Sequence, residues 1–136
     1  TQDADMILVS MGSIISTMKD VVDELRKEGK KIGILKIRTY RPFPKEEITQ
    51  VLKNKMKAVI IEKSISLGGV GILTADIKAS LYGLKNTPEI SNFIIGLGGR
   101  DIRKEDIREI VKLSEKGVKE NEFIGLDKKL LEEMDK

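Results

Sequence analysis

Residues 6–37, MILVSMGSIISTMKDVVDELRKEGKKIGILKI, decide the fold of this chain of 136 residues. They open with a continuous apolar run, residues 6–10, that has the length of a buried strand. Residues 14–25 then place apolar side chains at helical spacing, and Gly29 is typical of a helix end. Residues 31–37 alternate between apolar and other side chains and are rich in β-branched residues, which predicts a second strand. Strand, amphipathic helix and strand in succession predict an α/β fold with a mostly parallel sheet.

The same alternation continues along the chain. Residues 58–61 and 91–95 are two more apolar runs of strand length. Three further stretches predict helices, with buried faces made by Ile48, Val51 and Leu52, by Leu73, Ile77 and Leu81, and by Ile107, Ile110, Val111 and Ser114.

No linker rich in Gly or Ser divides the chain, so we expect one domain over residues 1–118. Residues 119–136 are expected to form a charged tail with a short helix, whose apolar face would carry Leu126, Leu130 and Met134.

The residue types that the chain lacks exclude several chemistries. Without Cys or His there is no thiolate nucleophile, no Ser-His-Asp triad and no thiolate-bound zinc or iron–sulfur cluster. The 25 basic and 22 acidic side chains are mixed and only 4% of residues are aromatic, which argues against a nucleic-acid partner. No apolar run approaches the ~20 residues of a membrane span. We therefore expect a soluble cytoplasmic protein that binds neither membranes nor nucleic acid.

A glycine-rich loop follows the third predicted strand, at an edge where open α/β sheets bind ligands. Gly68, Gly69 and Gly71 precede a predicted helix, whose first N–H groups suit an anion. Their spacing matches neither a P-loop nor a dinucleotide fingerprint, and the residues favour the simpler interpretation of a sharp turn. Glu62, just before this loop, is the one carboxylate with the position of a catalytic group, but no partner is visible.

A second loop, Gly98-Gly99-Arg100-Asp101, follows the fourth predicted strand. Arg100 could hold a phosphate or carboxylate through two hydrogen bonds. Equally, Arg100 and Asp101 could pair with other loops or another subunit, and Asp101 could cap the next helix. A structural or interface role is favoured, because an Arg beside an Asp is often satisfied locally.

Residues 38–44, RTYRPFP, form an unusual segment at a strand end. Two prolines stiffen it, and Arg, Tyr and Phe are enriched at protein contacts. A rigid crossover with solvated arginines is the alternative to an interface. We expect no catalytic residue and no metal ligand in the chain, and the candidate interface or anion-binding residues are Arg38, Arg41, Phe43, Glu62, Gly68, Gly69, Gly71, Gly98, Gly99, Arg100 and Asp101.

These motifs resemble a known domain family. Over about residues 3–118 the chain resembles the transketolase C-terminal-like domain of thiamine-diphosphate enzymes, on DMILVSMGS (5–13), KIRTYRPFP (36–44), VIIE (59–62) and GGVG (68–71). Within that family it is most similar to the alpha subunit of pyruvate:ferredoxin oxidoreductase, on RPFP (41–44), GLGGRD (96–101) and FIGL (123–126). Dehydrogenase beta subunits usually have Gly-Gly-Pro-Asp at positions 98–101, where this chain has Gly-Gly-Arg-Asp.

The resemblance implies a three-layer α/β/α sandwich with a mixed five-stranded sheet, of which the sequence leaves one strand unplaced. It implies that the complete enzyme converts pyruvate, coenzyme A and oxidised ferredoxin to acetyl-CoA, carbon dioxide and reduced ferredoxin. Thiamine diphosphate, Mg²⁺ and iron–sulfur clusters would be bound by other domains. This domain would bind no cofactor, be inactive alone, and pack against the rest of the alpha subunit and the other subunits. The start at Thr1 fits an excised piece of a longer chain.

Two alternatives stay open. The chain could be the corresponding domain of a transketolase or a 2-oxoacid dehydrogenase beta subunit, and the loop at residues 98–101 discriminates these from the first interpretation. It could also belong to another 2-oxoacid:ferredoxin oxidoreductase; the 2-oxoglutarate enzymes typically have Asn and Gly-Gln after the Glu, where this chain has KSISLG (63–68). It could also be a stand-alone module that binds an anion at its strand-end loops.

Overall fold

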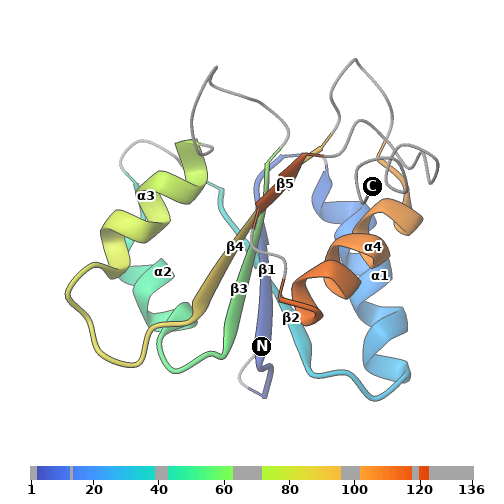
Figure 1. The fold of residues 1–136 in the computed structure, drawn as a ribbon, viewed down its shortest axis with the longest axis horizontal. Coiled ribbons are helices and arrows are strands. Elements are labelled where there is room, and N and C mark those ends of the chain that lie inside the picture. Colours follow the sequence, from blue (N-terminus) through green and yellow to red (C-terminus); the bar gives the residue numbers. More distant parts are fainter. Residues whose placement is uncertain are drawn as a thin grey trace.

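Strands and helices alternate along the whole described part of the chain. The computed structural model describes residues 3–12, 14–38, 43–62, 72–95, 102–117 and 120–122. Over these residues the elements are β1 (Met6–Ser10), α1 (Ile14–Lys27), β2 (Ile32–Lys36), α2 (Lys45–Leu52), β3 (Lys57–Glu62), α3 (Ile72–Leu81), β4 (Glu89–Ile94), α4 (Lys104–Glu115) and β5 (Glu120–Glu122) (Figure 1).

The described strands form one sheet in the order β2-β1-β3-β4-β5. All four strand pairings are parallel, with Met6 opposite Ile32 and Lys57, and Lys57 opposite Glu89. The predicted α/β class is therefore confirmed. The antiparallel strand that a mixed sheet requires is absent from the described pairings, because a helix returns the chain across the sheet before each new strand begins.

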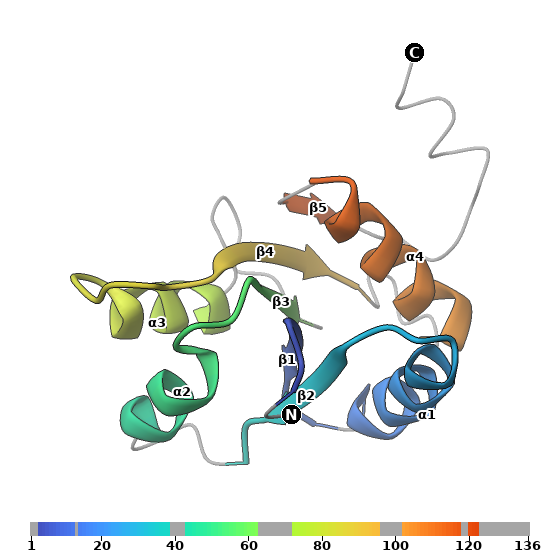
Figure 2. The same cartoon turned by 90° about the horizontal axis from the view of Figure 1, so that it is seen from below.

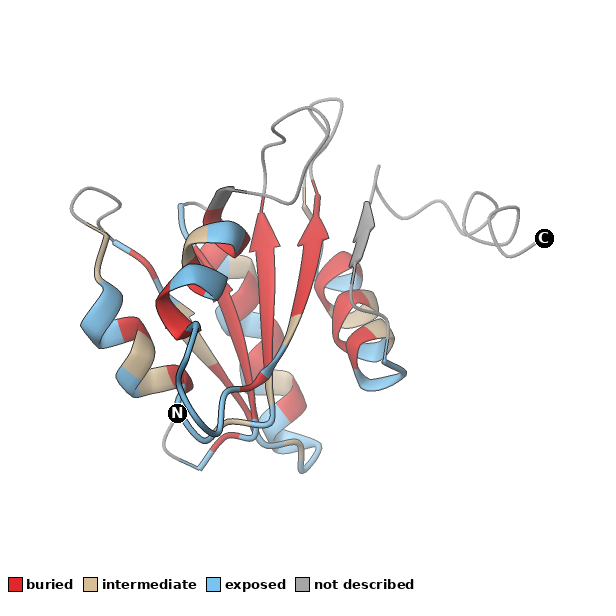
Figure 3. Ribbon diagram, turned by 60° about the vertical axis from the view of Figure 1, so that its left-hand side comes forward, coloured by how far each residue is buried: buried red, intermediate tan, exposed pale blue. Residues whose placement is uncertain are grey.

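Helices cover both faces of the sheet, as the three-layer prediction requires. Figures 1 and 2 show α1 and α4 on one side of the sheet and α2 and α3 on the other. Alternate residues of each central strand point to the two sides, so β1 sends Leu8 towards α1 and Val9 towards α2. Both faces of the central strands are buried (Figure 3), and residues 6–9 of β1 and 58–61 of β3 are accordingly continuous apolar runs.

The predicted helix faces are the buried ones. In α1, Ile14, Met18, Val21, Val22 and Leu25 are all buried, and the corresponding apolar residues of α3 and α4 lie in the core as well. Gly29 ends α1 with φ +91°, a left-handed conformation that favours glycine.

The fifth strand lies where the sequence predicted the charged tail. β5 pairs with β4, with Asn92 opposite Glu120, so the sheet extends past residue 118, the predicted end of the domain. The helix expected around Leu126, Leu130 and Met134 lies outside the described residues. Strand β5 has three residues, too few to show an apolar strand pattern in the sequence.

The connection through α4 has the opposite hand to the other three. α3 and α4 both carry the chain outward in the same direction along the sheet, but they lie on opposite faces (Figure 2). Parallel crossovers share one hand in nearly all proteins, so this connection is the exception in the described sheet. Its helix is held on the α1 face by its own apolar residues Ile107, Ile110 and Val111, which join the core cluster of α1.

Candidate functional site

The carboxyl edge of the sheet carries the residues that the sequence singled out. Ser10, Lys36, Glu62 and Ile94 are the last residues of β1 to β4, and parallel pairing brings these ends to one edge. The Ser10 hydroxyl donates to the Ile61 carbonyl oxygen at 2.7 Å, which joins β1 to β3 through a side chain.

Glu62 is buried at this edge, and both of its carboxylate oxygens accept hydrogen bonds from α3. Oε1 accepts the Leu73 backbone N–H at 2.8 Å. Oε2 accepts the Thr74 hydroxyl at 2.8 Å and the Thr74 backbone N–H at 3.3 Å. The side chain reaches α3 because Glu62 follows Ile60 by two residues and so points to the same face of the sheet.

This arrangement gives the N-terminal turn of α3 an anion from within the chain. The first N–H groups of a helix lack partners inside the helix and carry partial positive charge, so a carboxylate there is stabilised. Glu62, which the sequence singled out as a candidate catalytic carboxylate, therefore joins β3 to α3 in the described residues. Two of the first-turn N–H groups are committed to this contact.

Arg38 and Phe43 lie together beside β2 and α2. Both line a hollow of about 540 Å³, with Ile37, Pro44 and Glu47 among the other residues of its wall. Arg38 is exposed, whereas Phe43 is half-buried and packs against the apolar cluster beneath α2 and α3. Glu62 is separated from this hollow by β1, so the structure does not bring the three candidates into one site.

The remaining candidates lie outside the described residues. These are Arg41, Gly68, Gly69, Gly71, Gly98, Gly99, Arg100 and Asp101. Capping of the next helix was one of the roles that the sequence left open for Asp101. Within the described chain, the Asp106 carboxylate accepts the Arg103 backbone N–H at 2.8 Å at the start of α4.

Two residues of this edge escaped the sequence analysis. Thr74 and Ser10 are buried hydroxyl residues, and each lies beside apolar neighbours in the chain. A hydroxyl on an otherwise apolar face was the available signal, because a buried polar group needs a hydrogen-bond partner.

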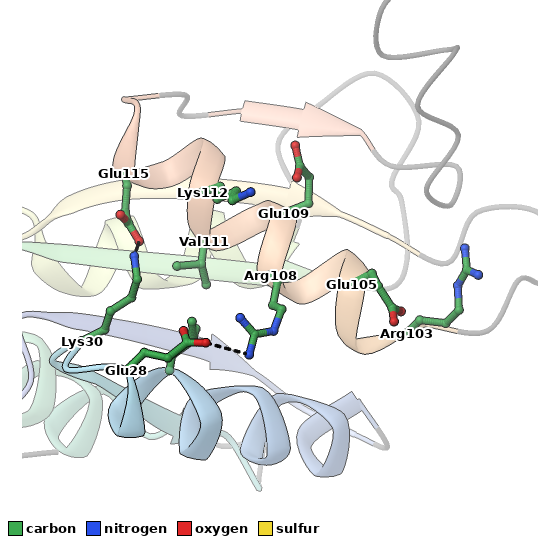
Figure 4. Close-up of a pocket in the computed structure, with 10 residues that line it drawn as sticks. Glu28, Lys30, Arg103, Glu105, Arg108, Glu109, Val111, Lys112 and Glu115 are labelled. Carbon is green, nitrogen blue, oxygen red and sulfur yellow. Dashed lines mark hydrogen bonds and ion pairs between the residues drawn. The ribbon is translucent and has the colours of Figure 1, made fainter.

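A groove of about 630 Å³ runs along the seam between α1 and α4, on the face of the sheet away from Glu62 (Figure 4). Its floor includes Leu25 and Val111. Its rim is charged, but opposite charges pair across it: Lys30 lies 2.6 Å from Glu115 and Arg108 lies 3.5 Å from Glu28. The groove is therefore best described as a packed helix seam whose rim charges stabilise the contact.

Glu24 is the centre of the ionic cluster on this seam. Its Oε2 lies 3.3 Å from Lys104 Nζ, and its Oε1 lies 3.3 Å from Arg108 Nη2. Lys104 and then Arg108 hold the pKa of this carboxyl below its ordinary value of 4.5, against a smaller opposing effect of burial.

Within the described residues, no group of three or more acidic side chains is placed to hold a metal ion. Among the helices described, none is both long enough and apolar enough to cross a lipid bilayer.

The chain matches one protein-family model over most of its length. The family is described as pyruvate:ferredoxin oxidoreductase core domain II, and the match covers residues 4–107.

Curated relatives match nearly the whole chain. Pyruvate synthase subunit PorA of Methanosarcina barkeri is 42% identical over 95% of this chain and 34% of the relative. The subunit of the same name from Methanocaldococcus jannaschii is 47% identical over 84% of this chain and 28% of its own length. Ketoisovalerate oxidoreductase subunit VorA of Pyrococcus furiosus is 40% identical over 90% of this chain and 32% of its own length. The chain thus spans about a third of the length of these relatives.

We predict that Glu62→Ala destabilises the chain by about 2–3 kcal/mol, because three donors of α3 lose a charged acceptor in a buried place. Glu62→Gln keeps the shape and should cost less. Urea denaturation measures both, with exposed Asp23→Ala as the control, for which we expect a change within about 0.5 kcal/mol. An unchanged midpoint for Glu62→Ala would show that the carboxylate does not support the fold.

We also predict an acid-sensitive contribution from Glu24. The pKa of Glu24 is lower in the folded chain than in the unfolded chain, so the unfolded state binds more protons at a pH between the two pKa values. The stabilisation by Glu24 is complete above pH 4.5, the ordinary pKa of the carboxyl, and is lost as the pH falls through the lower pKa of the folded chain. Thermal melts from pH 7 to pH 3 should therefore show a higher melting temperature for the wild type than for Glu24→Gln at neutral pH. The two melting temperatures should converge in acid. A gap that persists at the acid end contradicts this assignment.

Proposed function

Because the chain belongs to the pyruvate:ferredoxin oxidoreductase core domain II family, we propose that it is the core domain II portion of an oxidoreductase alpha subunit. In the complete enzyme, pyruvate, coenzyme A and oxidised ferredoxin would give acetyl-CoA, carbon dioxide and reduced ferredoxin. The observation that carries this proposal is the family match over residues 4–107. Relatives named pyruvate synthase subunit PorA, at 42–47% identity, support pyruvate as the substrate.

The family match also bears on the alternatives from the sequence. It supports an oxidoreductase over a transketolase or a dehydrogenase beta subunit. A relative named for ketoisovalerate is 40% identical, which lies within the range of 39–47% found for pyruvate synthase subunits. Similarity in this domain therefore discriminates weakly between 2-oxoacids, which is expected if the substrate pocket is formed elsewhere in the enzyme.

We propose a structural and assembly role for this domain. The strongest support is Glu62, since a carboxylate that accepts three hydrogen bonds from α3 is committed to holding β3 and α3 together. The same contact argues against a stand-alone anion-binding module, because the helix start that would receive the anion already has one.

The described residues do not fit a thiamine-diphosphate site. Binding a pyrophosphate through Mg²⁺ needs oxygen ligands gathered around the metal, and no acidic cluster of that kind occurs in the described part of the chain. We propose that this cofactor and the iron–sulfur clusters belong to other parts of the complete enzyme. A cytoplasmic location stays a prediction.

Contact with the rest of the enzyme is proposed at the hollow formed by Arg38 and Phe43. Arg38 is exposed at the rim of this hollow, and Phe43 packs on the core below it. Interface hot spots are rich in arginine and aromatic residues that pack on a well-ordered core. We still propose Arg41, Arg100 and Asp101 as interface residues, because the sequence places them in loops that follow predicted strands.

Substrate preference tests the proposed activity. We expect the complete oxidoreductase that contains this chain to reduce ferredoxin in the presence of coenzyme A with a higher kcat/KM for pyruvate than for ketoisovalerate. Initial rates with both 2-oxoacids measure this, and reactions without coenzyme A are the control. A preference for ketoisovalerate would contradict the pyruvate assignment, and no activity with either would contradict the oxidoreductase assignment.

Arg38→Ala tests the proposed interface. In the isolated chain we expect a change of less than about 0.5 kcal/mol in the free energy of unfolding, because the side chain is exposed. In the complete enzyme, loss of one partner of a charged contact should weaken assembly by about 2–5 kcal/mol. Lys19→Ala, on the exposed side of α1, is the control. Destabilisation of the isolated chain with normal assembly would assign Arg38 to the fold.

A further inference from the structure

Exposed apolar side chains gather at the amino edge of the sheet, opposite the hollow formed by Arg38 and Phe43. Tyr82 is 90% exposed, Met56 68% and Leu84 43%. The other large apolar residue exposed in the described part of the chain, Met11, follows β1 at the carboxyl edge. Single exposed apolar residues are ordinary on protein surfaces, but three on two loops at the same edge of the sheet suggest a contact surface.

These side chains lie on two neighbouring loops. Met56 lies between α2 and β3, and Tyr82 and Leu84 lie between α3 and β4. The Asn54 N–H donates to the Asn86 carbonyl oxygen at 2.9 Å, and the Glu89 N–H donates to the Met56 carbonyl oxygen at 3.0 Å. The loops are therefore joined through their backbones.

The backbone of this surface is also well defined. Asn54 and Asn86 have φ values of 66° and 60°, and Gly83 has φ +82°. These are left-handed conformations of turn residues, which fix the direction of each loop. Loops whose turns are restricted in this way lose less conformational entropy when a partner docks.

The charge of the two loops has one sign. Residues 53–57 and 82–88 contain four lysines and neither Asp nor Glu. Lys57 is turned away and donates to the Ser114 carbonyl oxygen of α4, but Lys53 and Lys85 are exposed beside the apolar side chains. Asp5 and Glu89, both exposed, flank the loops without reversing this lysine surplus. We call Lys53, Met56, Tyr82, Leu84 and Lys85 the amino-edge patch.

We infer that the amino-edge patch docks an acidic protein surface with an apolar centre, carried by another subunit of the oxidoreductase. Tyr82, Met56 and Leu84 provide the apolar centre, and Lys53 and Lys85 provide a basic rim that complements carboxylates. The inference rests on the proposed function for the identity of the complex. It goes beyond that function because it assigns a second contact surface, on the edge opposite Arg38.

The charge of the patch selects this occupant over two others. A second copy of the chain, docked through the same patch, would place lysines against lysines, which opposes association. A bilayer would attract the lysines, but the loops present only three apolar side chains and no amphipathic helix to insert. Both occupants are outcomes of the experiment below.

Zero-length crosslinking of the complete oxidoreductase tests the inference. A carbodiimide joins an amine to a carboxylate only when the two are in contact, and mass spectrometry identifies the joined peptides. We expect Lys53 and Lys85 to be joined to Asp or Glu of a different subunit, and a matched reaction in high salt to show fewer of these crosslinks. Crosslinks from these lysines only to carboxylates of the same alpha subunit, such as Asp5 or Glu89, or to a second copy of the chain, would overturn the inference.

Variants of the complete enzyme give a second readout. Lys53→Glu combined with Lys85→Glu, and separately Tyr82→Ser, should each raise the dissociation constant for the partner subunit about tenfold or more. Lys19→Glu combined with Lys27→Glu makes the same charge change on exposed residues of α1 and should leave it unchanged. Equal melting temperatures show that each variant is folded.

Failure of this inference is distinguishable from failure of the proposed function. If the wild-type complex assembles and oxidises pyruvate while patch variants assemble normally, only the docking surface is wrong. Sedimentation with vesicles of phosphatidylserine and phosphatidylcholine gives the remaining outcome. Binding of the complex to these vesicles that patch variants lose, with subunit contacts intact, would assign the patch to a membrane and overturn the inference.

Discussion

The carboxylate of Glu62 is the contact on which the arrangement of this domain depends. Its two oxygens receive three donors from the start of α3, which anchors the helix to the end of the central strand β3. Ser10 then joins the neighbouring strand β1 to the Ile61 carbonyl oxygen. Because a buried carboxylate without partners is very costly, the contact between Glu62 and Thr74 restricts both side chains. The edge that serves ligands in many α/β proteins is here partly closed by the chain itself.

An edge closed in this way suits a domain whose contribution to an enzyme is to hold other parts in place. The buried side chains of Ser10, Glu62 and Thr74 have hydrogen-bond partners within the chain, and the exposed large apolar side chains of the described residues lie at both ends of the strands. The charged groove between α1 and α4 follows the same logic, since each cation at its rim that forms an ion pair does so with a carboxylate across the seam.

Much of this fold was predictable from the sequence because apolar spacing is a direct consequence of burial. The four longer strands and the buried faces of all four helices follow from that spacing, as Leu73 and Ile77 illustrate. Strand β5 could not be predicted in this way, because its three residues are too few to show an alternation of apolar and polar side chains. The partner of Glu62 could not be predicted either. Thr74 is 12 positions away, and only the close approach of α3 to β3 brings the two side chains together.

The unusual hand of the α4 connection has a consequence during synthesis of the chain. The apolar side chains on the α1 side of the sheet, including Val59, Ile61 and Phe93, are covered partly by α4, which follows them in sequence. Glu24 and its partner Arg108 are 84 residues apart. At a synthesis rate of about 5–20 residues per second, α1 waits on the order of ten seconds for the helix that packs beside it. Until then the nascent domain has a water-exposed apolar face, and a chaperone that shields such faces would meet it there.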